Sequence, residues 1–186
     1  MKGLKCIHEK NFIHRDIKSE NVLLRQISTE SGYKMEYKIA DFGFARSIGG
    51  VGAKTHCGTE KYMAPEIINN AYYGISVDLW AVGVLLFFML YAEYPFKGNL
   101  ILNLGHDMRA DIQKKCSPFF NVTTVVSKKD KLKDLNPDLE DFFKQIFVVD
   151  SKKRITFSNI IKHPLFQKYR HSFEDTAVFY SEHERK

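Results

Sequence analysis

The apolar run at residues 79–92 constrains the fold more than any other part of the sequence. It reads LWAVGVLLFFMLYA and contains no charged residue. A helix that is apolar on every side belongs in a protein core or in a membrane. Because a membrane-spanning helix needs about 20 apolar residues, this shorter run predicts a buried helix around which the rest of the chain packs.

Length and composition indicate one globular domain. The chain has 186 residues, of which 44% are hydrophobic and 27% are charged. These values are ordinary for a soluble protein with a substantial core. The net charge of +6 suits acidic partners such as nucleotide phosphates. No motif that mixes aromatic and basic residues accompanies that charge, so no nucleic-acid partner is predicted.

The cysteines and the lack of a targeting segment indicate the compartment. Cys6, Cys57 and Cys116 lie far apart and form no C-x-x-C pair, and the histidines do not cluster at metal-ligand spacing. A zinc site is therefore not expected. An odd number of cysteines, without a signal peptide or a membrane-spanning segment, predicts a cytoplasmic protein with no membrane partner.

Two polar motifs flank a predicted β-hairpin. The first, HRDIKSEN, ends at Asn21, and the second, DFG, begins at Asp41. Residues 22–24 and 37–40 are predicted to pair as short strands. Asn21 would then enter one strand where Asp41 leaves the other, so both side chains would lie at the same end of the hairpin. The polar segment 25–36, which contains a Ser-Gly turn signal, is predicted to be a surface insertion.

Hydrophobic spacing predicts helices on both sides of the apolar run. Residues 1–10 form the end of an amphipathic helix, and residues 97–135 contain short helices. A longer helix begins at Asn136-Pro137, and Thr156 is the expected N-cap of the next helix. The longer helix carries an apolar stripe with helical spacing, formed by Leu139, Phe142, Phe143, Ile146 and Phe147.

The remaining motifs lie in the middle and at the end of the chain. The glycine-rich stretch at residues 49–55 fails both phosphate-loop patterns, because Ala53 and Thr55 stand where glycine is needed, and it favours a flexible loop. The other short patterns are T-x-C-G-T at residues 55–59, A-P-E at 64–66, D-x-W-x-x-G at 78–83, and a late arginine, Arg154.

Together these motifs resemble the catalytic domain of eukaryotic serine/threonine protein kinases. The resemblance covers residues 1–166 and matches the C-terminal lobe of that domain, with residues 167–186 as a tail. It implies an α+β, mainly helical fold with a short β-hairpin by the catalytic loop and with the N-terminal lobe absent. T-x-C-G-T is closest to the calcium/calmodulin-dependent kinase group. Ser19, where many such kinases have proline, is a small departure.

The resemblance implies roles for residues of the first two motifs, with ATP and Mg²⁺ as cofactors. Asp16 is the catalytic base, and Lys18 lies at the γ-phosphate of ATP, as is typical of serine/threonine kinases. Asn21 and Asp41 are the expected Mg²⁺ ligands, because Mg²⁺ prefers oxygen ligands. Leu23 would form an apolar floor under the nucleotide. The partner is a protein substrate with a serine or threonine acceptor.

The segment from Asp41 to Glu66 resembles a kinase activation segment. Thr59 is expected to hydrogen-bond near the catalytic aspartate and lysine and to shape the substrate groove. Thr55 stands where many such kinases are phosphorylated, and Arg15 could pair with the phosphate through its two-pronged guanidinium group. An unmodified Thr55 remains the alternative.

Three residues have expected structural roles. Asp78, at the start of the apolar helix, would accept backbone hydrogen bonds from the catalytic loop. Glu66 and Arg154 would form a buried ion pair that joins the activation segment to the helical core. Loss of one member of such a pair costs about 3–5 kcal/mol.

The sequence leaves two functions open. The first is a serine/threonine kinase whose native chain also supplies the N-terminal lobe, with the glycine-rich loop, lysine and glutamate that complete an ATP site. The second is a catalytically impaired, pseudokinase-like binding or scaffold module. The complete set of Asp16, Lys18, Asn21 and Asp41 favours the kinase. Residues 1–186 alone are predicted to bind nucleotide weakly and to transfer phosphate very slowly.

Overall fold

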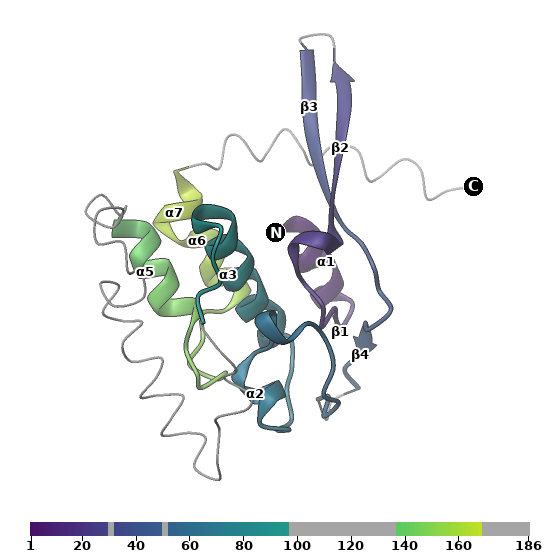
Figure 1. The fold of residues 1–186 in the computed structure, drawn as a ribbon, viewed down its shortest axis with the longest axis vertical. Coiled ribbons are helices and arrows are strands. Elements are labelled where there is room, and N and C mark those ends of the chain that lie inside the picture. Colours follow the sequence, from purple (N-terminus) through teal and green to yellow (C-terminus); the bar gives the residue numbers. More distant parts are fainter. Residues whose placement is uncertain (30–31, 50–51, 97–136, 169–186) are drawn as a thin grey trace.

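The computed structural model describes residues 1–29, 32–49, 52–96 and 137–168. The short helices expected within 97–135, and all of the expected tail beyond residue 168, lie outside these ranges. The described residues combine helices with two small two-stranded sheets (Figure 1). The expected mixture of helix and sheet is therefore present.

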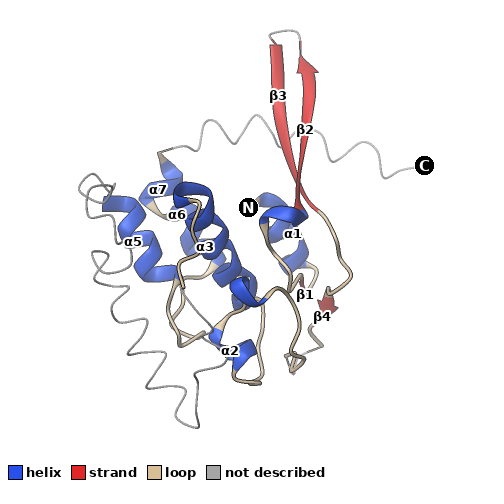
Figure 2. Ribbon diagram, viewed as in Figure 1, coloured by secondary structure: helices blue, strands red, loops and turns tan. Residues whose placement is uncertain are grey.

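The apolar run forms most of helix α3 (Ser76–Tyr91), which lies among the other helices (Figure 2). Its N-terminal and middle turns are buried. Gly83 allows close packing with α5 (Pro137–Ile146), because a Cβ at this position would lie only 2.8 Å from the Ile146 side chain. The C-terminal turn is different: Met89 is 68% exposed and Leu90 is 49% exposed. The prediction of a helix buried on every side is thus wrong for its last turn.

The N-terminal segment leads the chain into the first polar motif. Helix α1 (Lys2–Glu9) buries Leu4 and His8 and confirms the predicted amphipathic helix. The next strand, β1 (Phe12–Ile13), pairs antiparallel with β4 (Arg46–Ser47). This pairing holds the chain on either side of the two polar motifs close together.

The predicted hairpin is longer than expected. Strands β2 (Val22–Thr29) and β3 (Gly32–Ile39) pair antiparallel along their whole length, from Val22 opposite Ile39 to Thr29 opposite Gly32. They project from the helical body (Figures 1 and 2). The expected short strands were therefore wrong in extent, because segment 25–36 continues the strands. Its aromatic and β-branched residues favour this pleated conformation.

The C-terminal part packs against α3. The turn η2 (Glu60–Tyr62) and helix α2 (Pro65–Ile68) precede α3 in the chain, and α5 starts at Pro137 as predicted. Its expected stripe is buried at Phe142, Ile146 and Phe147. Helix α6 (Phe157–Lys162) has the predicted cap, because Thr156 Oγ1 accepts a 3.4 Å hydrogen bond from the Asn159 backbone N–H. Helix α7 (Pro164–Gln167) follows directly.

The core side chains of these elements meet around Trp80. Its ring stacks on Phe96 with a centroid separation of 5.0 Å, and Phe147 meets it edge-on at 5.2 Å. Aromatic pairs at such distances add to the stabilisation from burial. Among the residues that the structure describes, no helix combines the length and the apolar character needed to cross a membrane.

Candidate active site

The base of the β2–β3 hairpin brings the two polar motifs together. Asn21 is the last residue of the turn η1 (Ser19–Asn21), directly before β2. Its carbonyl oxygen accepts a 2.9 Å hydrogen bond from the backbone N–H of Ala40, the residue before Asp41. The structure therefore places Asn21 and Asp41 at the same end of the hairpin, which is the arrangement that the strand pairing predicted.

Asp16 is a buried carboxylate with a full set of hydrogen-bond partners. Its Oδ1 accepts from the backbone N–H of Thr59 at 3.1 Å and from the Thr59 hydroxyl at 2.8 Å. Its Oδ2 lies 2.8 Å from Lys18 Nζ and accepts from Asn21 Nδ2 at 2.9 Å. Lys18 also donates to Thr59 Oγ1 at 3.0 Å. Four of the expected site residues thus form one connected network.

This network keeps both central groups charged. Burial works against the charged form of Asp16, but hydrogen bonds from Lys18 and Thr59 outweigh it, so the pKa of Asp16 lies below its ordinary value. The hydrogen bond to Asp16 raises the pKa of Lys18 despite burial, and the negative charge of Asp41 adds to this effect. Near neutral pH the site therefore holds a carboxylate beside an ammonium group.

His14 connects the two motifs, although the sequence analysis gave it no role. Its ring is fully buried, with Nε2 3.1 Å from the carbonyl oxygen of Ala40 and Nδ1 accepting from the Asp16 backbone N–H at 3.4 Å. The ring also meets Phe42 edge-on at 5.1 Å. The position of His14 as the first residue of the HRDIKSEN motif was the available signal, but its contacts with residues 40–42 required the fold.

The oxygen ligands at the hairpin base fit Mg²⁺ that arrives with a nucleotide. The Asn21 amide nitrogen is engaged by Asp16, which leaves its amide oxygen as the group available to a cation. Asp41 adds a carboxylate, of which Oδ1 accepts a 3.1 Å hydrogen bond from Gly43 N–H. Mg²⁺ takes one or two carboxylates, waters and substrate phosphates. Among the described residues there is no group of three or more His, Cys, Asp or Glu that could hold a metal ion.

Leu23 lies beside the base of the β2–β3 hairpin, on the exposed part of β2. Its side chain is 55% exposed, so it offers apolar surface next to the two oxygen ligands. That position suits the role predicted for it, which was to form a floor under a nucleotide base.

Asp78 fixes the backbone of His14 and Arg15, at the start of the first polar motif. Its Oδ2 accepts from His14 N–H at 2.9 Å and lies 2.8 Å from His8 Nε2, and its Oδ1 accepts from Arg15 N–H at 2.9 Å. Arg15 has a φ of 69°, an uncommon conformation for a residue with a side chain. The expected backbone hydrogen bonds are present, and they hold this unusual conformation in place.

The unmodified Thr55 hydroxyl accepts a 3.1 Å hydrogen bond from Arg46. Arg15 donates to the Phe44 carbonyl oxygen at 2.6 Å and to the Tyr73 hydroxyl at 3.2 Å. Tyr73 then donates to the Thr55 carbonyl oxygen at 2.6 Å. Within the described part of the chain, Tyr73 thus connects Arg15 to the backbone of Thr55. The expected pairing of Arg15 with a phosphate on Thr55 stays a prediction.

The sequence patterns therefore did not identify Arg46 and Tyr73 as contacts of Thr55. Arg46 is brought to Thr55 by the pairing of β1 with β4, and Tyr73 by its own two backbone hydrogen bonds with Ala53, both 2.9 Å long. Neither contact follows a short sequence spacing. The only available signal was that Arg46 lies inside the predicted activation segment.

The expected ion pair between Glu66 and Arg154 is present and bidentate. Arg154 Nη1 lies 2.8 Å from Glu66 Oε1, and Nη2 lies 2.9 Å from Oε2. Arg154 also donates to the carbonyl oxygens of Ser76 and Val148 and lies over the Trp80 ring. Both side chains are almost fully buried. Glu66, at the end of the predicted activation segment, is thereby joined to the helical core.

Comparison with known proteins shows the family to which the chain is similar. The family model for the protein kinase domain matches residues 1–166. The serine/threonine-protein kinase ATG1a of Arabidopsis thaliana is 34% identical over 169 residues, which cover 90% of this chain and 25% of that protein. The Aurora kinase of Dictyostelium discoideum is 31% identical, over 95% of this chain and 40% of that protein. The serine/threonine-protein kinase DCLK3 of Mus musculus is 32% identical, over 92% of this chain and 20% of that protein.

The fold and the family match define the class: the chain belongs to the protein kinase family. Its relatives include serine/threonine kinases, which confirms that part of the resemblance. The chain spans less than half the length of the three relatives named above.

Proposed function

We propose that this chain is the catalytic part of a serine/threonine protein kinase, which transfers the γ-phosphoryl group of ATP to a serine or threonine hydroxyl of a protein substrate. The observation that carries the proposal is the network in which Asp16 contacts Lys18, Asn21 and Thr59, beside Asp41 at the hairpin base. Phosphoryl transfer depends mainly on positioning and on charge neutralisation, and this network supplies both.

The proposed reaction gives each residue a task. Asp16 orients the acceptor hydroxyl and receives its proton as the new oxygen–phosphorus bond forms and the bond to ADP breaks. Lys18 holds the transferred group through its positive charge. Mg²⁺ bound by Asn21 and Asp41 would neutralise phosphate charge. Thr59, which contacts both Asp16 and Lys18, keeps these two side chains in position.

We further propose that residues 1–166 are the C-terminal lobe of the kinase domain, and that the native polypeptide supplies an N-terminal lobe. The described residues offer oxygen ligands and an apolar floor at Leu23, which together would hold one side of a nucleotide. The T-x-C-G-T segment supports membership of the calcium/calmodulin-dependent kinase group. Residues 1–186 alone should therefore transfer phosphate much more slowly than the native polypeptide.

The test compares Asp16→Asn with Glu9→Gln in the native polypeptide, using radiolabelled ATP, Mg²⁺ and a mixture of generic protein substrates. Glu9 is an exposed acid in a surface pair with Lys5 and serves as the control. We expect Asp16→Asn to lose about 10²–10⁴-fold in rate, the usual contribution of a general base, and Glu9→Gln to keep the wild-type rate.

The opposite outcomes are distinct. A folded wild-type protein without transfer activity would favour the binding-module alternative. Activity that survives Asp16→Asn would refute the role of Asp16. The mass of the native polypeptide should be measured first, because it shows whether an N-terminal lobe is present in the same chain.

We also propose that phosphorylation of Thr55 activates the enzyme. A phosphate on this hydroxyl would lie beside Arg46, and Arg15 lies behind the same backbone through Tyr73. Arginine is well suited to bind phosphate. Thr55→Ala should abolish activation by an upstream kinase and leave a low basal rate, whereas an unchanged specific activity of the fully activated enzyme would contradict this role.

A further inference from the structure

Ser19, in the HRDIKSEN motif, contacts side chains from two parts of the chain. Its hydroxyl donates a 2.7 Å hydrogen bond to Glu20 Oε2 and lies 3.4 Å from the hydroxyl oxygen of Tyr62, the last residue of η2. The hydrogen bond from Ser19 lowers the pKa of Glu20, so this carboxylate is charged near neutral pH and can only accept. The single Ser19 proton therefore points to Glu20, and Tyr62 is the donor in the longer contact.

The ring of Tyr62 is anchored to α3. Tyr62 is only 3% exposed, and its ring meets Tyr94 edge-on with a centroid separation of 5.7 Å. Tyr94 in turn stacks on Phe88 of α3 at 4.9 Å. Aromatic pairs in these geometries add to the stabilisation from burial. Because burial raises the pKa of Tyr62, its hydroxyl keeps the proton that it offers to Ser19.

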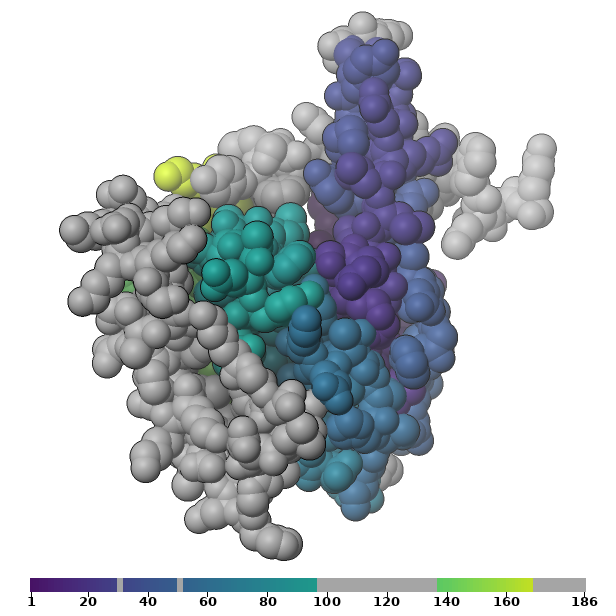
Figure 3. Space-filling view, viewed as in Figure 1, coloured from purple at the N-terminus to yellow at the C-terminus, as the bar shows by residue number. Residues whose placement is uncertain are grey.

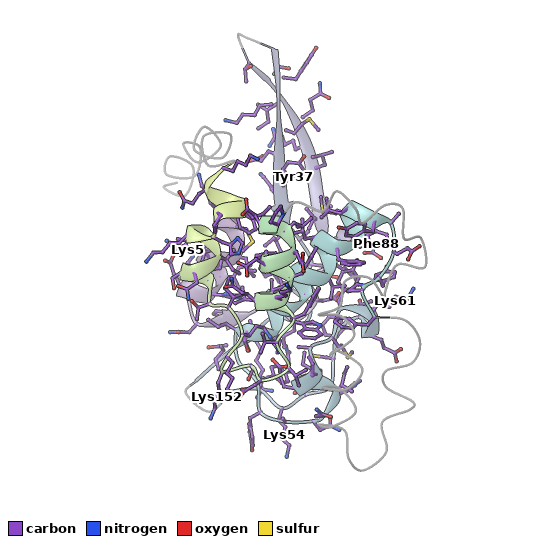
Figure 4. All side chains as sticks on the ribbon, turned by 90° about the vertical axis from the view of Figure 1, so that its left-hand side faces the viewer. Lys5, Tyr37, Lys54, Lys61, Phe88 and Lys152 are labelled. Carbon is purple, nitrogen blue, oxygen red and sulfur yellow. The ribbon has the colours of Figure 1, made fainter. Side chains whose placement is uncertain are left out.

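The exposed side of η2 contacts the same aromatic group. Lys61 Nζ lies 4.5 Å from the centroid of the Tyr94 ring, a distance at which the face of the ring attracts an ammonium group. Figure 4 shows Lys61 and Phe88 on the same side of the molecule. A buried ring and an exposed lysine thus both hold η2 against the end of α3.

The turn η2 is attached to the HRDIKSEN motif at two points. Thr59, its N-cap residue, contacts Asp16 and Lys18, and Tyr62 at its other end contacts Ser19. A turn that is attached at one point can rotate about that point, whereas a second attachment fixes its direction. Figure 3 shows the parts of the chain involved, coloured purple, blue and teal, meeting below the hairpin.

The middle of η2 lies where a protein substrate would approach. Glu60 and Lys61 are exposed between the two attachments, and Thr59 directly contacts Asp16, the proposed acceptor of the hydroxyl proton. Along an extended chain, successive residues are only about 3.3 Å apart. A substrate whose hydroxyl reaches Asp16 therefore brings its neighbouring residues close to η2, so the orientation of this turn affects how well the substrate binds.

We propose that Ser19 is a positioning residue, which accepts a hydrogen bond from the Tyr62 hydroxyl and thereby holds η2 in the orientation that binds a protein substrate. This role rests on the proposed kinase function. The contacts of Thr59 with Asp16 and Lys18 do not involve Ser19. Loss of the Ser19 hydroxyl should therefore weaken the binding of protein substrate and leave the binding of ATP and the transfer step nearly unchanged.

The test measures steady-state kinetics of the native polypeptide, with whichever of casein, histone and myelin basic protein the wild type phosphorylates fastest. Ser19→Ala removes the accepting hydroxyl, Tyr62→Phe removes the donor, and Ser19→Thr keeps a hydroxyl. We expect the first two variants to raise the KM for the protein substrate about three- to tenfold, as for the loss of one hydrogen bond, with kcat and the KM for ATP close to wild type. The double variant should match either single variant, because both remove the same contact, and Ser19→Thr should restore the wild-type KM.

The matched controls are Ser158→Ala and Tyr72→Phe. Ser158 is an exposed serine whose hydroxyl lies 3.0 Å from Thr156 Oγ1, and Tyr72 is 64% exposed, so both variants should keep the wild-type KM. A second measurement needs no turnover. Amide hydrogen exchange over residues 60–63 should be faster in Ser19→Ala than in the wild type or in Ser158→Ala, because η2 has lost one of its two attachments.

Three results would each overturn the proposal. They are an unchanged KM for the protein substrate in Ser19→Ala, a lower kcat with an unchanged KM, and a KM that rises in Ser19→Ala but not in Tyr62→Phe, which would assign the effect to Glu20. A wild-type protein that transfers no phosphate would refute the proposed function, and the substrate role of Ser19 with it. Faster exchange in Ser19→Ala would still show in that case that Ser19 holds η2.

Discussion

At the scale of single residues, the site depends on two backbone conformations that most side chains avoid. Arg15 has a φ of 69° and Asp41 has a φ of 59°. Such conformations cost about 1–3 kcal/mol each and persist only when neighbouring groups hold them. Asp78 holds Arg15 through the backbone, and Gly43 donates to the Asp41 side chain. Both conformations lie where the proposed catalytic and metal-binding side chains are oriented.

Tyr73 allows a residue-scale prediction. Tyr73→Phe removes the hydroxyl that accepts a hydrogen bond from Arg15 and donates one to the Thr55 carbonyl oxygen. It keeps the ring and the backbone hydrogen bonds to Ala53. We expect a loss of about 1–3 kcal/mol in the stability of the activation segment, measured as faster amide hydrogen exchange over residues 52–59, together with a several-fold lower rate of phosphoryl transfer.

The neighbouring tyrosine supplies the control for this prediction. Tyr72→Phe removes the hydroxyl of an exposed ring that lies near Lys54. Amide hydrogen exchange over residues 52–59 and the rate of phosphoryl transfer in this variant should therefore match those of the wild type. Equal exchange over residues 52–59 in Tyr73→Phe and wild type would show that the hydroxyl does not hold the segment.

At the scale of elements, the Glu66–Arg154 pair joins α2 to the turn before α6. Each single change, Glu66→Leu or Arg154→Met, should lower the free energy of unfolding by about 3–5 kcal/mol, because a buried charge loses its partner. The double variant should cost less than the sum of the two, since both charges are then removed. Urea unfolding at neutral pH measures all three values.

Lys153→Met is the control for this prediction, because Lys153 is next to Arg154 but is 79% exposed and only loosely paired with Asp150. It should leave the free energy of unfolding nearly unchanged. Strictly additive costs for Glu66 and Arg154 would show that the two side chains do not stabilise each other.

Local sequence patterns predicted the presence of the helices and strands well, but they predicted the lengths of these elements less well. The apolar run, the cap at Thr156 and the meeting of Asn21 with Asp41 follow from short-range spacing. The hairpin was predicted too short because polar residues between 25 and 36 masked an alternation that only strand pairing reveals. The contact of Arg46 with Thr55 depends on a pairing between distant strands, for which no local signal exists.

At the scale of the whole molecule, Asp78 joins three parts of the described fold. Asp78 lies in the first turn of α3, and its Oδ2 is 2.8 Å from Nε2 of His8 in α1. Its carboxylate also accepts hydrogen bonds from the backbone N–H groups of His14 and Arg15. Stability and catalytic geometry are therefore linked through one buried carboxylate, which is 1% exposed.

Asp78→Asn tests this link. Asparagine presents one oxygen and a competing N–H₂ group to three donors, so we expect a loss of about 2–4 kcal/mol in the free energy of unfolding and at least a tenfold loss of activity. Thermal denaturation and a transfer assay at a temperature where the variant stays folded measure the two effects. Asp150→Asn, in a partly exposed turn, is the control. A folded Asp78→Asn enzyme with full activity would separate stability from the site.

The four hydrogen bonds around Asp16 also bear on the hydrolysis of ATP by water in the proposed reaction. A carboxylate offers about four lone-pair positions, and here Thr59, Lys18 and Asn21 occupy them. A water molecule that enters the site therefore finds no free oxygen to take its proton. A protein hydroxyl held in place by a whole substrate can displace one of these partners, whereas a single water cannot be held so firmly. In the proposed reaction, this arrangement would therefore favour transfer to protein over hydrolysis of the nucleotide between substrate encounters.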